Sequence, residues 1–327
     1  AASRPDNAIL WYENTDGAGT FGPAQTITTD AAGATRVQVG DLDSDGDLDV
    51  ASASAGDDTI AWYANDGSGD FGAQQVITSN AAGARGMVLS DLDGDGDLDV
   101  VTASFYDDTI AWHENQGGGS FSERKVVSAG SLSGPVALNA ADLNGDGAPD
   151  IVAFSKMDGR LVWYPNSGAG SFGAEQALDA LGHHHTDNIE AADMDGDGDL
   201  DLLFSGWYEV VWYENTDGSG SFSADHTVWQ PDQVPPDGGG GDKAIAADLD
   251  GDDDLDVLSC GNIGRPNVVW WHRNSGTGSF LSHEQLVYYG IVGTHAVMRA
   301  GDVDGDGDLD VVSASRLARR IDWFENR

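Results

Sequence analysis

The stretch DLDGDGDLDV at residues 91–100 recurs five more times along the chain with few changes. The other copies are DLDSDGDLDV at 41–50, DLNGDGAPDI at 142–151, DMDGDGDLDL at 193–202, DLDGDDDLDV at 248–257 and DVDGDGDLDV at 302–311. Their starting positions are 50, 51, 51, 55 and 54 residues apart. A period of about fifty residues predicts a repeat architecture in which one supersecondary unit is copied along the chain.

A second motif keeps the same period and is centred on Trp. It reads ILWYEN at 9–14, IAWYAN at 60–65, IAWHEN at 110–115, LVWYPN at 161–166, VVWYEN at 210–215, VWWHRN at 269–274 and IDWFEN at 321–326. A Gly/Ser turn ending in Phe follows six of the seven, at Phe21, Phe71, Phe121, Phe172, Phe222 and Phe280. Because each Trp alternates with its neighbours on a predicted strand, we expect it to pack between sheets rather than to form a sugar-stacking platform.

Each unit contains four short segments that are typical of β-strands. In the unit that starts at residue 36 they are RVQVGD, LDVASAS, DTIAWYAN and AQQVIT, here called strands A to D. Each is alternating or β-branched and ends at Gly, Asp, Asn or Ser. Four-stranded antiparallel units at this period predict the blades of an all-β propeller, formed as a single domain by residues 1–327.

These residues also carry a family resemblance. The pairing of a D-x-D-x-D-G-x-x-D loop with a downstream G-x-G-x-F turn resembles the FG-GAP/VCBS repeat family over essentially the whole chain. That family builds calcium-binding β-propellers, which include the integrin α-subunit head, fungal lectins and propeller-type polysaccharide lyases. The resemblance is specific for the fold and unspecific for the activity.

The number of blades depends on the two ends of the sequence. The pattern contains six A, six B, seven C and six D strands. If every blade needs an inner A strand, the chain forms six blades, and the first D strand, near residues 24–28, completes the last blade. The alternative is seven blades with an upstream segment missing. We expect six.

The Asp-rich loops are predicted to bind calcium. Ca²⁺ takes six to eight oxygen ligands in irregular geometry, and side chains at loop positions 1, 3, 5 and 9 supply them, while position 7 supplies its backbone carbonyl. Gly at position 6 permits the tight turn. The predicted ligands are Asp41, Asp43, Asp45, Asp47 and Asp49; Asp91, Asp93, Asp95, Asp97 and Asp99; Asp142, Asn144, Asp146, Ala148 and Asp150; Asp193, Asp195, Asp197, Asp199 and Asp201; Asp248, Asp250, Asp252, Asp254 and Asp256; and Asp302, Asp304, Asp306, Asp308 and Asp310.

Variation among the loops agrees with this assignment. Position 7 is Ala148 in the third loop, as expected where only the carbonyl binds, and Asn144 still presents an oxygen. The fifth loop has Asp253 in place of Gly, although Asp tolerates the left-handed region better than most residues. EF-hands are excluded because they end with Glu at position 12 and lie between helices. We therefore expect about six structural calcium ions, and metal-free solvated turns are the alternative.

Composition limits the classes of partner. With 56 acidic and 15 basic residues the net charge is −41, which argues against binding to nucleic acid. Solubility of a secreted or halophilic protein would explain this total but not the spacing of the acids. No apolar stretch approaches the roughly 20 residues that cross a bilayer, so we expect no membrane insertion. No charged and apolar leader opens the sequence, so we expect any export signal to lie outside it or to have been removed. The one cysteine, Cys260, cannot form an internal disulfide.

The connections at the end of the strands opposite the loops differ most between units. Because propellers display binding residues on such loops, we predict a ligand face there for an acidic or sulfated glycan. Its candidate residues are His183, His184, His185, Trp207, Tyr208, Arg265, His295, Arg316 and Arg319. The alternative is that these loops vary by drift.

Three functions follow from the sequence. The first is a calcium-stabilised extracellular or cell-surface adhesion module that binds a glycan or a surface protein, without enzyme activity. The second is a polysaccharide lyase or related carbohydrate enzyme, for which no spacing selects a catalytic residue. The third is a structural subunit of a surface assembly, in which unpaired terminal strands drive self-assembly.

Overall fold

The computed structural model describes residues 1–180, 188–206, 209–229, 241–261, 268–280, 282–287, 296–315 and 320–326. Within these ranges the chain forms β-strands, turns and bends. No helical segment among them has the length and hydropathy of a membrane span.

Every strand falls into one of the four predicted classes, except for a two-residue strand at the N-terminal end, β1 (Ala2–Ser3). The A strands are β4 (Ala34–Gly40), β8 (Ala84–Ser90), β12 (Pro135–Ala141), β16 (Ile189–Ala192), β20 (Gly241–Ala247) and β24 (Ala296–Gly301). The B strands are β5 (Asp49–Ser54), β9 (Asp99–Ser104), β13 (Asp150–Ser155), β17 (Asp201–Ser205), β21 (Asp256–Gly261) and β25 (Asp310–Ser315). The C strands are β2 (Ala8–Trp11), β6 (Thr59–Tyr63), β10 (Thr109–His113), β14 (Arg160–Tyr164), β18 (Val210–Tyr213), β22 (Val268–Arg273) and β26 (Arg320–Phe324). The D strands are β3 (Gln25–Thr28), β7 (Gln75–Thr78), β11 (Lys125–Ala129), β15 (Gln176–Ala180), β19 (His226–Trp229) and β23 (Ser282–Val287).

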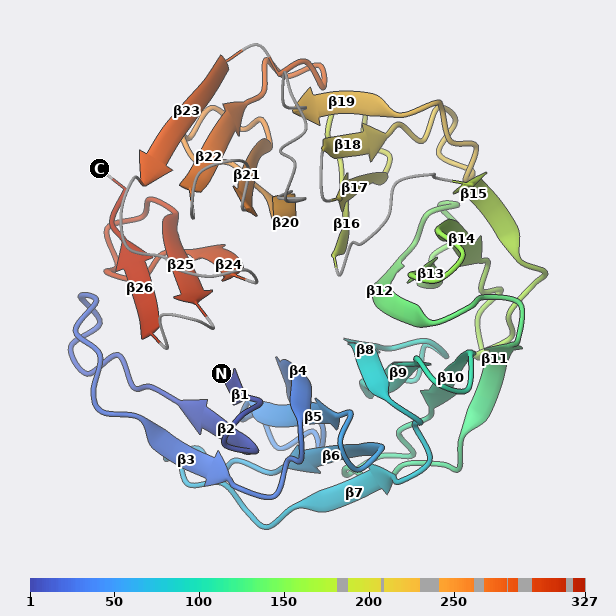
Figure 1. Ribbon diagram of the computed structural model, residues 1–327, viewed down its shortest axis with the longest axis vertical. Coiled ribbons are helices and arrows are strands. Elements are labelled where there is room, and N and C mark those ends of the chain that lie inside the picture. The colour runs from blue at the N-terminus through green and yellow to red at the C-terminus, as the bar shows by residue number, and fades with distance from the viewer. Residues whose placement is uncertain are drawn as a thin grey trace. The chain divides into compact units, whose positions relative to one another are not determined.

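These strands form seven antiparallel sheets, each of which is one blade of a β-propeller (Figure 1). Five blades have the order A-B-C-D, from β4–β7 through β20–β23. The first blade is β1-β2-β3 and the last is β24-β25-β26, each with three strands. In all six blades that have a D strand, the C–D pairing shifts register once, as it does between Ile60 and Ala61.

The prediction of six blades was therefore wrong. Strand β3 does not complete the last blade, because it pairs with its chain neighbour β2, from Ile9↔Thr28 to Trp11↔Gln25. The first C and D strands thus form a blade of their own, and the short β1 pairs with the other edge of β2 through Ala2↔Ile9 and Ser3↔Ala8. Among the described strands β26 pairs only with β25, and self-assembly through terminal strands stays a prediction.

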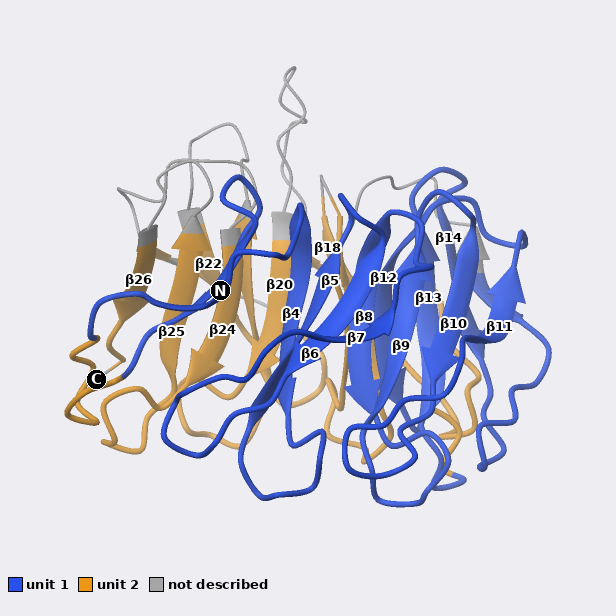
Figure 2. Ribbon diagram, turned by 90° about the horizontal axis from the view of Figure 1, so that it is seen from below, with its two compact units in different colours: residues 1–13, 22–142, 146–181 blue, residues 14–21, 143–145, 182–327 orange. Residues whose placement is uncertain are grey.

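The chain divides into two compact units, coloured separately in Figure 2. Unit 1 comprises residues 1–13, 22–142 and 146–181, and unit 2 comprises residues 14–21, 143–145 and 182–327. The prediction of a single domain over residues 1–327 stays a prediction.

In both units the core lies between neighbouring blades. The B and C strands are buried along most of their length, and the exposed residues gather on the D strands. In unit 1, Trp62 of one blade packs with Met87 and Val100 of the next. In unit 2, Trp212 packs in the same way with Ala244 and Val257. The predicted packing role of the Trp residues is confirmed where the indoles are buried, at Trp62, Trp112, Trp163, Trp212 and Trp271.

Glycines in the C–D hairpins allow this packing. A Cβ atom at Gly119 would overlap the indole of Trp62 in the preceding blade, and Gly170 stands in the same relation to Trp112. Both glycines have positive φ, which an L residue rarely adopts. In unit 2 the hairpin of the first blade reaches the last blade in this way, since Gly19 lies against Trp323.

The Asn after six of the seven C strands links neighbouring blades by a second contact. The Nδ2 of Asn115 donates to the carbonyl of Leu42, at position 2 of the preceding blade's Asp-rich loop, over 2.8 Å. The same bond joins Asn166 to Leu92 in unit 1. In unit 2 it joins Asn215 to Leu143, Asn274 to Met194, Asn326 to Leu249 and Asn14 to Val303.

Asn65 is the natural control for this contact. The first blade has no Asp-rich loop, so the Nδ2 of Asn65 donates only to Leu48 of its own blade. We expect Asn115→Ala to lower the free energy of unfolding by about 2–3 kcal/mol, because it leaves the buried carbonyl of Leu42 without this donor, and Asn65→Ala by about 1 kcal/mol. Urea denaturation followed by tryptophan fluorescence measures both. Equal losses would show that the inter-blade bond contributes nothing.

Candidate metal centres

Each Asp-rich loop winds around the carboxylate at its position 1. In the first loop, Asp41 accepts the backbone N–H groups of Asp45 (3.1 Å) and Gly46 (3.0 Å). The carboxylate at position 5 accepts the N–H of position 7, as Asp45 does from Asp47 over 3.0 Å. These bonds hold the turn closed without help from another segment.

Two positions of the loop adopt the left-handed region. Position 6 does so with φ between 71° and 100°, and Asp253 has the smallest value of that set. Its N–H donates to Asp248 as the Gly at that position does in other loops, so Asp253 leaves the turn intact. Position 4 is also left-handed, which sequence reasoning missed although the signal was visible: this position is Ser44 once and Gly in the other five loops.

Carboxylate oxygens converge in five of the six loops among the described residues. One oxygen from each of positions 1, 3 and 5 lies within 4.8 Å of the others in the first, fourth, fifth and sixth loops. In the second loop the converging set is Asp91, Asp93 and Asp99, at positions 1, 3 and 9. The third loop has Asn144 at position 3 and so offers fewer carboxylates.

Position 9 is buried and holds the blade together. Asp49 accepts the N–H of Leu42 (2.9 Å) on one oxygen and that of Asn65 (2.8 Å) on the other. In all six loops this carboxylate accepts the N–H of the Asn after the C strand. Burial raises the pKa of Asp99 and of Asp201 to about 7. This residue therefore joins loop and strand, whether or not it also binds a cation.

The carboxylates at position 3 have the surroundings that best fit a bound cation. Oδ1 of Asp43 and Oδ1 of Asp93 are buried and accept no hydrogen bond. The pKa of Asp43 and the pKa of Asp93 are raised above the usual range for Asp. Burial is the larger cause, and repulsion by neighbouring carboxylates is the second. Desolvated, mutually repelling carboxylates fit an environment completed by a divalent cation, which would supply the opposite charge.

Position 7 points elsewhere. Oδ1 of Asp97 accepts the hydroxyl of Ser44 in the preceding blade's loop over 2.7 Å. The carboxylate of Asp47 lies beside Gly67 in the C–D hairpin of its own blade. Neither side chain belongs to a converging set.

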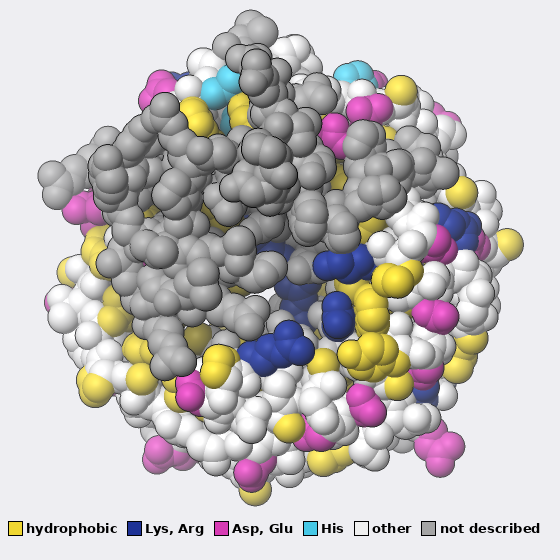
Figure 3. Space-filling model, viewed as in Figure 1, with side chains coloured by type: hydrophobic (Ala, Val, Ile, Leu, Met, Phe, Trp, Pro, Cys, Tyr) yellow, Lys and Arg dark blue, Asp and Glu magenta, His cyan; other side chains and the backbone are white. Residues whose placement is uncertain are grey.

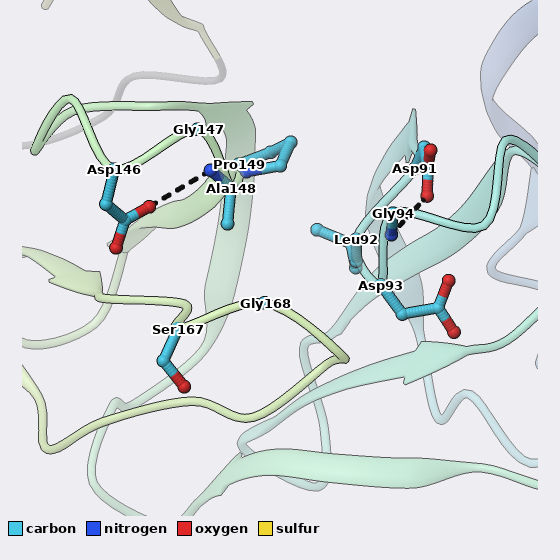
Figure 4. Close-up of a pocket in the computed structure, with 10 residues that line it drawn as sticks. All are labelled: Asp91, Leu92, Asp93, Gly94, Asp146, Gly147, Ala148, Pro149, Ser167 and Gly168. Atoms are coloured by element: carbon cyan, nitrogen blue, oxygen red, sulfur yellow. Dashed lines mark hydrogen bonds between the residues drawn. The ribbon is translucent and has the colours of Figure 1, made fainter.

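A cleft of 590 Å³ in unit 1 separates two of the loops (Figure 4). Its lining comes from the second loop, the third loop and the hairpin of the fourth blade. Figure 4 shows the two loops facing each other across it, with the internal bonds of Asp91 and Asp146 that keep them closed. The lining residues are Asp91, Leu92, Asp93, Gly94, Asp146, Gly147, Ala148, Pro149, Ser167 and Gly168.

The residues predicted to bind a ligand at the opposite end of the strands lie outside the described residues. This holds for His183, His184, His185, Trp207, Tyr208, Arg265, His295, Arg316 and Arg319.

Comparisons with known proteins agree with the repeat. A family model described as FG-GAP-like repeat matches residues 1–52, 41–102, 91–153, 142–204, 193–259 and 248–313. No curated protein matches the chain.

Solved structures share the fold at low identity. One is an Agrocybe aegerita lectin that recognises non-reducing terminal N-acetylglucosamine, with a TM-score of 0.62, 20% identity, and coverage of 85% of this chain and 74% of the lectin. Another is the Bacillus licheniformis rhamnogalacturonan lyase PL11, with a TM-score of 0.50, 17% identity, and coverage of 90% of this chain and 57% of the lyase. Since the family matches run from residue 1 to residue 313, the chain belongs to the FG-GAP-like repeat family.

Proposed function

We propose that the chain is a calcium-stabilised extracellular binding module that recognises an acidic or sulfated glycan. Calcium would bind in the Asp-rich loops, and the glycan would bind at the opposite end of the strands.

The observation that carries the calcium part is the convergence of Asp oxygens around buried, unpaired Oδ1 atoms at Asp43 and Asp93. Hard carboxylate oxygens suit Ca²⁺ better than Zn²⁺, which favours His and Cys. Sites of this kind in extracellular modules bind with affinities on the order of 10⁻⁴–10⁻³ M, which millimolar calcium outside cells would fill.

The ligand part rests on a cluster in unit 1, at the end of the strands opposite the loops. The guanidinium of Arg85 lies 3.9 Å from the centre of the Phe105 ring. Phe105 packs edge-on against Tyr106, whose side chain is 69% exposed. The face in Figure 3 shows basic and hydrophobic side chains lying side by side.

An exposed aromatic beside a fixed cation suits a sugar that carries a negative charge. The aromatic face stacks on the apolar face of the sugar, and the guanidinium donates to sulfate or carboxylate oxygens. The lectin supports a glycan ligand by analogy of fold, because propellers of this kind are used for sugar recognition in that protein. The lyase has the same fold, and its activity is not transferred to this chain.

The second loop provides a matched pair of substitutions for the calcium part. Asp93→Ala removes a converging carboxylate and leaves no side-chain oxygen at position 3, so we expect the calcium stoichiometry measured by titration calorimetry to fall by one. Asp97→Ala removes the same charge from position 7, whose side chain faces Ser44, and should leave the stoichiometry unchanged. Identical behaviour of the two variants would contradict the assignment of position 3 as a ligand.

For the ligand part, a glycan array first identifies the bound sugar. Tyr106→Ala and Arg85→Ala should then each weaken binding about tenfold, because one removes stacking and the other a charged donor. Tyr12→Ala is the control, since Tyr12 is exposed but follows strand β2 at the loop end. Binding that survives both substitutions would place the ligand away from this cluster.

A further inference from the structure

The residue before the Asn that follows strand C lies beside position 3 of the Asp-rich loop of the same blade. Glu114 repels the charge of Asp93, Glu214 that of Asp195, and Glu325 that of Asp304. In the second and fourth blades the corresponding residues are Ala64 and Pro165, which carry no charge. This position therefore sets the local charge next to each converging set.

The sixth blade has Arg273 at this position. Its Nη1 lies 2.9 Å from Oδ2 of Asp250, at position 3 of the fifth loop. The guanidinium also lies 3.9 Å from the centre of the Trp271 ring, and its Nε lies 3.6 Å from Oε1 of Glu284. Trp271 and Glu284 thus hold the guanidinium of Arg273 against Asp250, which is one of the three converging carboxylates of the fifth loop.

A second difference affects position 9 of the same loop. The indole Nε1 of Trp271 donates to Oδ2 of Asp256 over 2.8 Å. The indole of the equivalent Trp212, in the fifth blade, has no hydrogen-bond partner. Strand β22 therefore supplies donors to two carboxylates of the fifth loop, at positions 3 and 9.

The additional acid in the fifth loop does not offset this. Asp253 is exposed and does not belong to the converging set of Asp248, Asp250 and Asp252. Its backbone N–H donates to Asp248 over 3.0 Å, as the N–H at position 6 does elsewhere. Asp253 preserves the turn and adds no oxygen to the cluster.

We propose that Arg273 is the resident cation of the fifth loop, so that this loop binds calcium at least about tenfold more weakly than the loops without such an arginine. The reason is that a divalent ion must separate the guanidinium from Asp250 and then remain close to its positive charge. The inference rests on the proposed calcium binding by the other loops. It predicts one fewer calcium ion than the number of loops when the remaining sites are filled.

The test is calcium stoichiometry of the full chain, measured by equilibrium dialysis at about 1 mM free calcium, in the range of extracellular affinities. Asp250→Ala should leave the stoichiometry unchanged, whereas the equivalent Asp93→Ala should lower it by one. Arg273→Glu gives the sixth blade the residue found at Glu114, Glu214 and Glu325, and should raise the stoichiometry by one. Arg273→Gln removes only the charge and should strengthen the fifth site at least about tenfold.

The control is Arg124→Gln, which removes an arginine paired with Asp107 away from the loops and should leave the stoichiometry unchanged. Circular dichroism checks that every variant is folded, and Arg273→Gln replaces Arg273→Glu if the latter is not. A loss of one calcium in Asp250→Ala, or no gain in either Arg273 variant, would overturn the inference and leave the proposed function intact. If the wild-type protein binds no calcium, both fail.

Discussion

The buried carboxylate at position 9 is the interaction on which the rest of each blade depends. One oxygen of this carboxylate accepts the N–H of the Asn after strand C. The other oxygen accepts the N–H of position 2, as in the first loop. An ionised carboxylate in an apolar interior is costly unless it is satisfied in this way. In five of the six blades with an Asp-rich loop, the same Asn uses its side-chain amide to hold the loop of the preceding blade, at Leu42 in the case of Asn115. Loop, strand and neighbouring blade are therefore coupled through two residues.

This coupling explains why a cation in the loops would stabilise more than a surface turn. The carbonyl that accepts the Asn side chain belongs to position 2, between the first two ligand positions, so a rigid loop presents a fixed acceptor to the next blade. Charge adds a second effect. Five divalent ions carry +10 and would bring the net charge from −41 to −31, which lessens self-repulsion in the compact state. A ligand that binds only the folded state stabilises it in proportion to the logarithm of its concentration.

Much of the fold was predictable because the repeat varies least at the positions where the backbone conformation tolerates few residue types. The Asp and Gly spacing located the six loops, and the alternation in the Trp motif located the C strands. The number of blades was mispredicted because every blade was assumed to need an inner strand. Strand β2 pairs with β3 instead, since only thirteen residues lie between these two strands and the short connection costs little entropy to close.

The site was predictable at the level of residue types and less so at the level of roles. Spacing marked position 9 as a ligand but gave no hint that both oxygens of Asp49 accept backbone amides, because the N–H of Asn65 reaches Asp49 only once strands β5 and β6 are paired. The role of Arg273 is visible only once strand β22 is placed beside the fifth loop. The nine candidate residues for ligand binding lie outside the described parts of the chain.

The most direct test of the central claim, that cations in the loops hold the blades together, is the melting temperature of the full chain in calcium and in chelator. Several sites with affinities on the order of 10⁻⁴ M predict a fall on the order of 10 °C or more when calcium is removed, and magnesium should restore little of it. An unchanged melting temperature in chelator would contradict the account.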